Sequence, residues 1–118
     1  MALTVYQYPG CSTCKRALAW LRAKDIAFES IDIVKAPPSS TVLARARDLA
    51  DVPVKKLFNV AGESYRAGDF KSKLPAMSDA AALAALAADG KLVKRPLALT
   101  GTHALIGFDE TAWAAALL

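Results

Sequence analysis

Residues 3–34 decide the fold, and they read LTVYQYPGCSTCKRALAWLRAKDIAFESIDIV. Residues 3–8 are rich in apolar, β-branched and aromatic side chains, and the run stops at Pro9-Gly10, which is typical of a buried strand that ends in a turn. Residues 26–34 alternate apolar and polar side chains imperfectly, as a second strand would. We therefore expect two strands joined through the intervening segment.

The segment between these strands has the period of a helix. Apolar side chains recur at i, i+3, i+4 and i+7, which gives one buried stripe on a helix over residues 14–25; they are Cys14, Ala17, Leu18 and Leu21. Arg16, Trp20 and Lys24 are expected on another face of this helix. A strand, a helix and a strand within about thirty residues predict a parallel, right-handed βαβ unit.

Residues 36–90 have a sequence pattern different from that of the βαβ unit, and we interpret them as a helical insertion. Ser39 or Ser40 can cap a helix over residues 41–50, and a short helical turn is expected over residues 53–58. A polar, glycine-containing connection follows at residues 59–72. Ser78 is expected to cap a helix over residues 79–89 that ends at Gly90.

The C-terminal part returns to strand-like sequence. We expect strand segments at residues 92–94, 97–100 and 104–108, with a hairpin turn at residues 101–103, and a final helix over residues 110–117 that Asp109 caps. The element order βαβ, helices, ββα predicts an α/β protein with a mixed four-stranded sheet. The helical insertion lies between the second and third strands.

Length and composition indicate a single globular domain, residues 1–118, with its sheet core at about 1–35 and 91–118. The chain has 54% hydrophobic and 22% charged residues, and its formal net charge is +4. The cations are scattered rather than clustered, so we expect no direct nucleic-acid binding.

The alanine-rich residues 80–88 are too few to span a membrane, and the first residues lack a secretion signal. A cytoplasmic, monomeric protein with no membrane association is expected.

Cys11 and Cys14 form the motif most indicative of chemistry. A C-x-x-C pair that follows a strand and opens a helix is typical of redox chemistry in an intracellular protein. Cys11, at the helix start, would face unpaired backbone N–H groups and the positive end of the helix dipole, which favour its thiolate. Cys14 belongs to the apolar stripe and fits a resolving thiol, with the two Cα atoms roughly 5–6 Å apart, within disulfide range.

Other roles for these cysteines remain open at this point. Both could be small buried core residues, because free cysteine is among the most buried residue types. A zinc site would need about four ligands, whereas the chain offers two cysteines and a distant histidine, His103, in a predicted turn. We therefore expect no metal site. Arg95-Pro96, at a strand start, could be a cis or an ordinary trans peptide bond.

Several separated motifs occur in the order seen in one known family, and the chain resembles the arsenate reductase/Spx family in its Spx/MgsR-like or YffB-like branch. These motifs are Tyr8-Pro-Gly-Cys11-x-x-Cys14, Ala19-Trp20-Leu21, Lys56-Leu57-Phe58-Asn59, Ser64-Tyr65-Arg66, Lys94-Arg95-Pro96-Leu97 and Ile106-Gly107-Phe108. The resemblance runs nearly end to end. It implies a thioredoxin-like fold with a helical insertion.

The resemblance also implies roles for individual residues. Cys11 would be the reactive thiol, the Arg95 guanidinium would point towards it and stabilise its charge, and Pro96 would be cis. We expect Cys11, Cys14 and Arg95 to be the catalytic residues. The expected substrate-positioning residues are Gly10, Ser12, Thr13 and Pro96.

Departures from the family pattern bear on the substrate. Glutaredoxin-linked arsenate reductases hold their oxyanion with three arginines; Arg95 matches one, and the other two positions fall on Asn59 and Gly107. Those enzymes carry a histidine-asparagine pair before the cysteine, where this chain has Gln7-Tyr8. Spx-type regulators contact the RNA polymerase α-subunit through a glycine in the helical insertion, and residues 42–54 contain no glycine.

We therefore expect a thiol-disulfide oxidoreductase with no bound cofactor and with glutathione or a similar thiol as co-substrate. A redox-sensing transcriptional regulator that binds RNA polymerase is the first alternative, and an arsenate reductase is the second.

Overall fold

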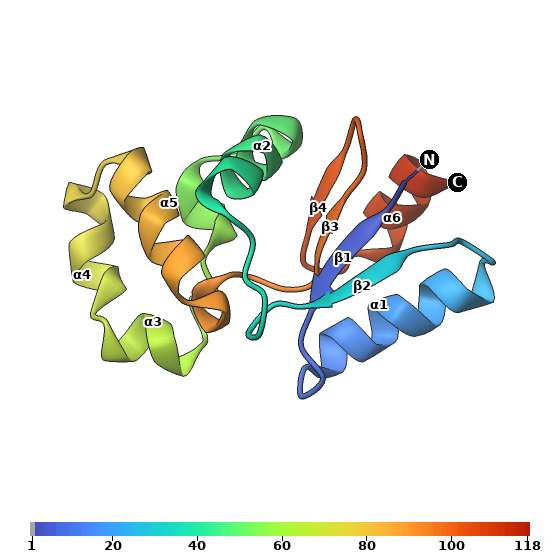
Figure 1. Ribbon diagram of the computed structural model, residues 1–118, viewed down its shortest axis with the longest axis horizontal. Helices are drawn as coiled ribbons and strands as arrows, with labels where there is room; N and C mark the ends of the chain where they lie inside the picture. Colours follow the sequence, from blue (N-terminus) through green and yellow to red (C-terminus); the bar gives the residue numbers. More distant parts are fainter. Residues whose placement is uncertain (1) are drawn as a thin grey trace.

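A computed structural model describes residues 2–118 and shows a mixed four-stranded sheet in the order β2-β1-β3-β4 (Figure 1). β1 pairs with β2 in parallel and with β3 antiparallel, and β3 and β4 form the antiparallel hairpin. The strands are β1 (Thr4–Gln7), β2 (Glu29–Asp32), β3 (Leu97–Leu99) and β4 (Ala104–Ile106). The predicted α/β class and mixed four-stranded sheet are confirmed.

Helices cover both faces of this sheet. α1 and α6 lie on one side, α2 lies on the other, and the remaining helices of the insertion extend away from the sheet (Figure 1). The α-helices are α1 (Ser12–Ala23), α2 (Ser40–Ala50), α3 (Glu63–Ala67), α4 (Phe70–Lys73), α5 (Asp79–Ala88) and α6 (Glu110–Leu117). Short 3₁₀ helices occur at η1 (Val54–Leu57), η2 (Leu74–Ala76) and η3 (Gly90–Leu92). No helix among residues 2–118 has the length and apolarity needed to cross a membrane.

Alternating side chains along the strands divide the core into two parts. Val5 and Ala98 face α1 and α6, where they pack with Leu18, Leu21 and Trp113. Their strand neighbours Tyr6, Leu97 and Leu99 face the insertion and pack with residues that include Leu43 and Leu86. Because successive side chains of a strand point to opposite faces, one short sheet supports both layers. The insertion is thereby packed directly onto β1 and β3.

Trp20, on the second face of the first helix, is covered by the C-terminal helix. Its side chain is buried, and its ring lies 6.3 Å from Trp113 and 6.1 Å from Phe108, measured between ring centroids. Trp20 therefore lies outside the first apolar stripe, as expected, but on a face of α1 that is itself covered at this position. The helical period could not reveal this, because α6 comes from the far end of the chain and covers a second stripe of α1.

Two segments of the insertion differ from the sequence prediction. Residues 59–72 were expected to be a polar connection, but α3 and the start of α4 lie there, and Tyr65 packs against both Phe58 and Phe70. Residues 92–94 were expected to be a strand, whereas η3 ends at Leu92 and only Val93 forms an isolated bridge, with Phe58. These aromatic contacts stabilise helices that are too short to persist alone.

The insertion returns to the sheet at a cis peptide bond between Arg95 and Pro96, as the resemblance implied. The segment before this bond is fixed by backbone hydrogen bonds, in which the Lys94 N–H donates to the Leu57 carbonyl (2.7 Å). After it, the Gly107 N–H donates to the Pro96 carbonyl (2.9 Å). The start of β3 is thereby held between the insertion and the turn that follows β4.

Candidate active site around Cys11

Cys11 is the N-cap residue of α1. Its φ and ψ angles of −95° and 113° are extended, and its Sγ accepts a hydrogen bond from the backbone N–H of Cys14 (3.2 Å). The Cys11 N–H donates in turn to the Tyr8 carbonyl (3.0 Å), which closes the turn through Pro9-Gly10. A sulfur in this position receives an N–H that the helix leaves unpaired and lies at the positive end of the helix dipole.

Cys14 lies one turn further along and is completely buried, while Cys11 is half-buried; both are free thiols. The pKa of the Cys14 thiol is raised to about 12, mainly by burial and also by the hydrogen bond with the Cys11 side chain and by the Cys11 charge. A hydrogen bond at the Tyr8 backbone and the positive charge of Arg95 act in the opposite direction. The two thiols therefore interact but differ sharply in environment, as the apolar stripe predicted.

We expect alkylation to distinguish the two thiols. At pH 8 the folded protein should take up one carbamidomethyl group from iodoacetamide, on Cys11, because a thiol with a pKa of about 12 is almost wholly protonated there and Cys14 is also shielded. Peptide mass spectrometry identifies the modified residue. In denaturant both thiols should react. Faster modification of Cys14 in the folded protein would contradict the assignment of the two roles.

Arg95 lies beside the same site. Its guanidinium lies over the Tyr8 ring, with Cζ 5.2 Å from the ring centroid, and its Nη1 donates to the Lys91 carbonyl (3.1 Å). Its Nε is buried and has no hydrogen-bond partner among the described residues. The stacking and the carbonyl contact fix the plane of the guanidinium and leave donor capacity unused.

Cys11 and Arg95 both line an open cavity of about 530 Å³ between the start of α1 and the turn after β4. Its other lining residues are Thr13, Arg16, Asn59, Lys94, Ile106, Gly107, Phe108 and Asp109. Asn59 and Gly107, the positions where the resemblance placed the missing arginines, therefore lie in the same cavity as Cys11. The sequence reasoning did not assign Lys94, Phe108 or Asp109 to the site, although the first two belong to motifs it singled out.

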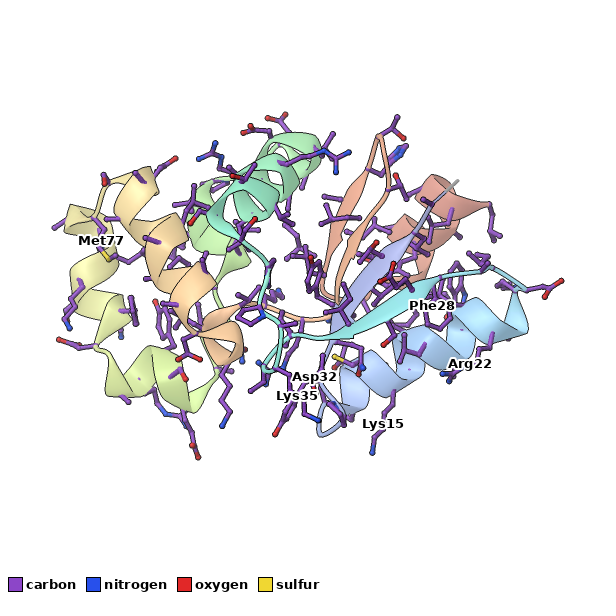
Figure 2. All side chains as sticks on the ribbon, in the orientation of Figure 1. Lys15, Arg22, Phe28, Asp32, Lys35 and Met77 are labelled. Carbon is purple, nitrogen blue, oxygen red and sulfur yellow. The ribbon has the colours of Figure 1, made fainter. Side chains whose placement is uncertain are left out.

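The remaining predicted site residues surround this cavity without lining it. Gly10 and Ser12 are exposed on either side of Cys11, and Pro96 is buried behind Arg95. Lys15 extends from α1 into solvent (Figure 2), whereas the next residue, Arg16, lines the cavity. His103 lies in the β3–β4 turn, where its Nδ1 is 2.9 Å from Thr102 Oγ1.

Comparisons with known proteins agree closely with this architecture. The model of the ArsC family matches residues 6–116. The uncharacterized protein YusI of Bacillus subtilis is 40% identical over 110 residues, which cover 93% of each chain. The crystal structure of an ArsC family related protein from Bacteroides fragilis has a TM-score of 0.94 and 40% identity, and covers 98% of this chain and 97% of that one.

A possible arsenate reductase from Streptococcus mutans has a TM-score of 0.89 and 39% identity, with 98% of each chain covered. The global transcriptional regulator Spx of Streptococcus agalactiae is more distant, at 21% identity, and the match covers 92% of this chain and 77% of that one. The fold is the thioredoxin-like fold that the motifs indicated. With its family model matched over almost its whole length, the chain belongs to the ArsC family, within the arsenate reductase/Spx group.

Proposed function

We propose that this protein is a cytoplasmic thiol-disulfide oxidoreductase that uses glutathione or a similar thiol. Its ArsC family membership, with arsenate reductase and Spx relatives, supports a thiol-dependent reductase-like or Spx-like role. One observation supports the assignment as a thiol-disulfide oxidoreductase. Cys11 Sγ accepts the Cys14 N–H at the start of α1 and also borders an open cavity, so a nucleophilic sulfur is accessible next to a second, buried thiol.

In the first step the Cys11 thiolate attacks one sulfur of a substrate disulfide. A new S–S bond forms to Cys11, the substrate S–S bond breaks, and the second sulfur leaves as a thiolate. The N–H of Cys14 and the dipole of α1 stabilise the attacking anion before the reaction. Arg95, beside the cavity, is placed to stabilise the leaving thiolate with its unused donors.

In the second step Cys14 attacks the Cys11 sulfur and releases the bound thiol, leaving a Cys11–Cys14 disulfide. The raised pKa of Cys14 would oppose this step in the free protein. Two causes of the increase, the hydrogen bond with Cys11 and the Cys11 charge, disappear once Cys11 is bonded to a substrate sulfur. The Arg95 charge, which lowers the pKa of Cys14, remains. Burial, the largest cause of the increase, remains as well, so formation of the adduct removes only the part of the increase in the pKa of Cys14 that comes from Cys11.

Two molecules of a small thiol then complete the cycle. The first attacks the Cys11–Cys14 disulfide and forms a mixed disulfide with one cysteine, and the second releases that cysteine and becomes part of an oxidised dimer. Two electrons pass from the two thiols to the protein disulfide in this stage. No bound cofactor is required, so the electron donor is the thiol itself.

The two alternatives differ from this proposal at identifiable residues. An arsenate reductase role would have only Arg95 at the three arginine positions of the clamp, since the other two hold Asn59 and Gly107, which carry no charge. A regulatory role that involves the RNA polymerase α-subunit is supported by the Spx relatives, and the same two thiols would then act as a redox switch. We rank both of these functions below the oxidoreductase function.

A comparison of substrates tests the proposal. The purified reduced protein should turn over a glutathione mixed disulfide in the presence of glutathione, with NADPH and glutathione reductase reporting the oxidised glutathione formed. Arsenate, at equal concentration with glutathione and glutaredoxin, should give a rate at least about tenfold lower, because Arg95 alone occupies one of the three arginine positions of the clamp and provides fewer charge-assisted hydrogen bonds there than the full set.

The controls for this comparison are the reaction without protein and the protein alkylated at Cys11. A rate with arsenate equal to or above that with the mixed disulfide would assign the protein to arsenate reduction. No turnover of either substrate, together with capture of RNA polymerase from a lysate, would instead assign the regulatory role.

A further inference from the structure

The side chain of Lys94 lies against the bare backbone of Gly107, at the edge of the Cys11 cavity. Gly107 has a φ angle of +74°, a conformation that L side chains rarely adopt. A β-carbon at this position would lie 3.2 Å from Lys94 Cε and 3.9 Å from Nζ. The glycine therefore leaves room for the last methylene and the ammonium of Lys94.

The backbone on both sides of this contact is fixed. The Lys94 N–H is held by the Leu57 carbonyl, and the Gly107 N–H is held by the Pro96 carbonyl. Lys94 is exposed, so its ammonium keeps contact with solvent and with any ligand in the cavity. The backbone positions of Lys94 and Gly107 are thereby held at the cavity that Cys11 also lines.

The charges around the cavity are unbalanced. Arg16, Lys94 and Arg95 line it together with one carboxylate, Asp109, whose Oδ1 already accepts the N–H groups of Thr111 and Ala112. The ion pairs found among residues 2–118 both involve Arg47, which lies elsewhere on α2. The three cations of the cavity are therefore not neutralised by a carboxylate within 4 Å, and their fields add inside a concave surface.

We infer that Lys94, with Arg16 and Arg95, forms an anion subsite that selects sulfur compounds carrying a carboxylate near the reacting sulfur. The inference rests on the proposed function for its substrate, a mixed disulfide of an acidic small thiol. The volume of about 530 Å³ lies in the range of sites that hold small organic molecules. Lys94 is thus a specificity-determining residue: it attracts the carboxylate, while Cys11 carries out the exchange.

Alkylation of Cys11 by two reagents of different charge tests this subsite without any turnover. Iodoacetate is anionic and iodoacetamide is neutral, and both transfer their carbon to the thiolate with loss of iodide. The ratio of the iodoacetate rate constant to the iodoacetamide rate constant should fall about 3–10-fold in Lys94→Gln at low ionic strength. Lys94→Arg should keep the ratio of the unmodified protein. Salt at about 0.5 M should remove most of the difference in this ratio between Lys94→Gln and the unmodified protein.

Lys15→Gln is the matched control. It removes the same charge four residues from Cys11, but Lys15 points into solvent and does not line the cavity (Figure 2). We expect its ratio to stay within about twofold of the unmodified protein, because solvent screens exposed charges. An equal fall in Lys15→Gln would show that net charge, not the subsite, causes the selectivity, and would overturn the inference.

The remaining outcomes are also decisive. If the ratio is unchanged in Lys94→Gln, or if both reagents slow down equally, Lys94 does not recognise anions and the inference fails. With the glutathione mixed disulfide, the KM of Lys94→Gln should rise while kcat stays the same, and a neutral hydroxyethyl mixed disulfide should show no KM change. Absence of any turnover would reject the proposed function, whereas the alkylation ratio would still decide the subsite.

Discussion

Cys11→Ser is expected to abolish disulfide exchange, with a loss of at least about 10³-fold in kcat/KM, because a serine hydroxyl stays protonated at neutral pH and cannot form the S–S bond. The fold should survive the change. Serine is a favoured N-cap residue, so its hydroxyl can accept the Cys14 N–H that Cys11 Sγ now accepts. Coupled turnover of the glutathione mixed disulfide measures the loss, and circular dichroism checks the helix content.

Cys14→Ser provides the matched comparison. This variant keeps the nucleophile but has no resolving thiol, so without free glutathione it should accumulate a mixed disulfide on Cys11 that intact-protein mass spectrometry detects. Excess glutathione should release the adduct and restore slow turnover. Full activity of Cys11→Ser would refute the proposed chemistry, and full activity of Cys14→Ser without adduct would remove Cys14 from it.

The second large effect is structural and concerns Gly90. A β-carbon at Gly90 would lie 1.8 Å from the Ile33 carbonyl oxygen and 2.7 Å from its carbon, both of them backbone atoms that cannot rotate away. We expect Gly90→Ala to lower the free energy of unfolding by about 3 kcal/mol, and the melting temperature by about 10 °C. Thermal and urea unfolding monitored by circular dichroism measure both quantities.

Gly101→Ala is the control for this prediction. Gly101 lies in the β3–β4 turn, and a β-carbon there would meet nothing within 4 Å. This variant should unfold within about 1 kcal/mol of the unmodified protein, because only the backbone entropy of the unfolded chain changes. Similar losses in both variants would mean that the contact with Ile33 does not limit the substitution.

The position of Gly90 also bears on the candidate site. Its contact with the end of β2 holds η3, and η3 leads through Val93 and Lys94 to Arg95. A shift of η3 away from the sheet would therefore displace both cations of this segment relative to Cys11. We expect any folded fraction of Gly90→Ala to show weakened selectivity between iodoacetate and iodoacetamide, measured as for Lys94.

The glycine also illustrates a limit of sequence reasoning. Gly90 was expected to end the preceding helix as a C-terminal cap. α5 instead ends at Ala88, Asp89 is the C-cap residue, and the positive φ angles among the described residues are at Asp25, Asp51, Asp69 and Gly107. Gly90 is needed for close approach to a strand 57 residues earlier, which no local pattern records.

The sequence by itself determined the features that depend on neighbours along the chain. The alternation in the strands, the spacing of the apolar side chains in α1 and the C-x-x-C motif at its start predicted the βαβ unit, the burial of Cys14 and the helix-start position of Cys11. The motif order predicted the family, and the family implied the cis bond before Pro96. Local periodicity was sufficient here because hydrogen bonding and burial within one element follow the chain.

Only the tertiary structure decided which distant residues share the cavity. Lys94 and Asp109 come from separate segments, and their place in the cavity beside Cys11 depends on how the insertion packs against the sheet. The burial of Trp20 by α6 and the helices in residues 59–72 have the same origin. Packing between elements is set by the shapes of many side chains at once, so its result cannot be obtained from the period of any single segment.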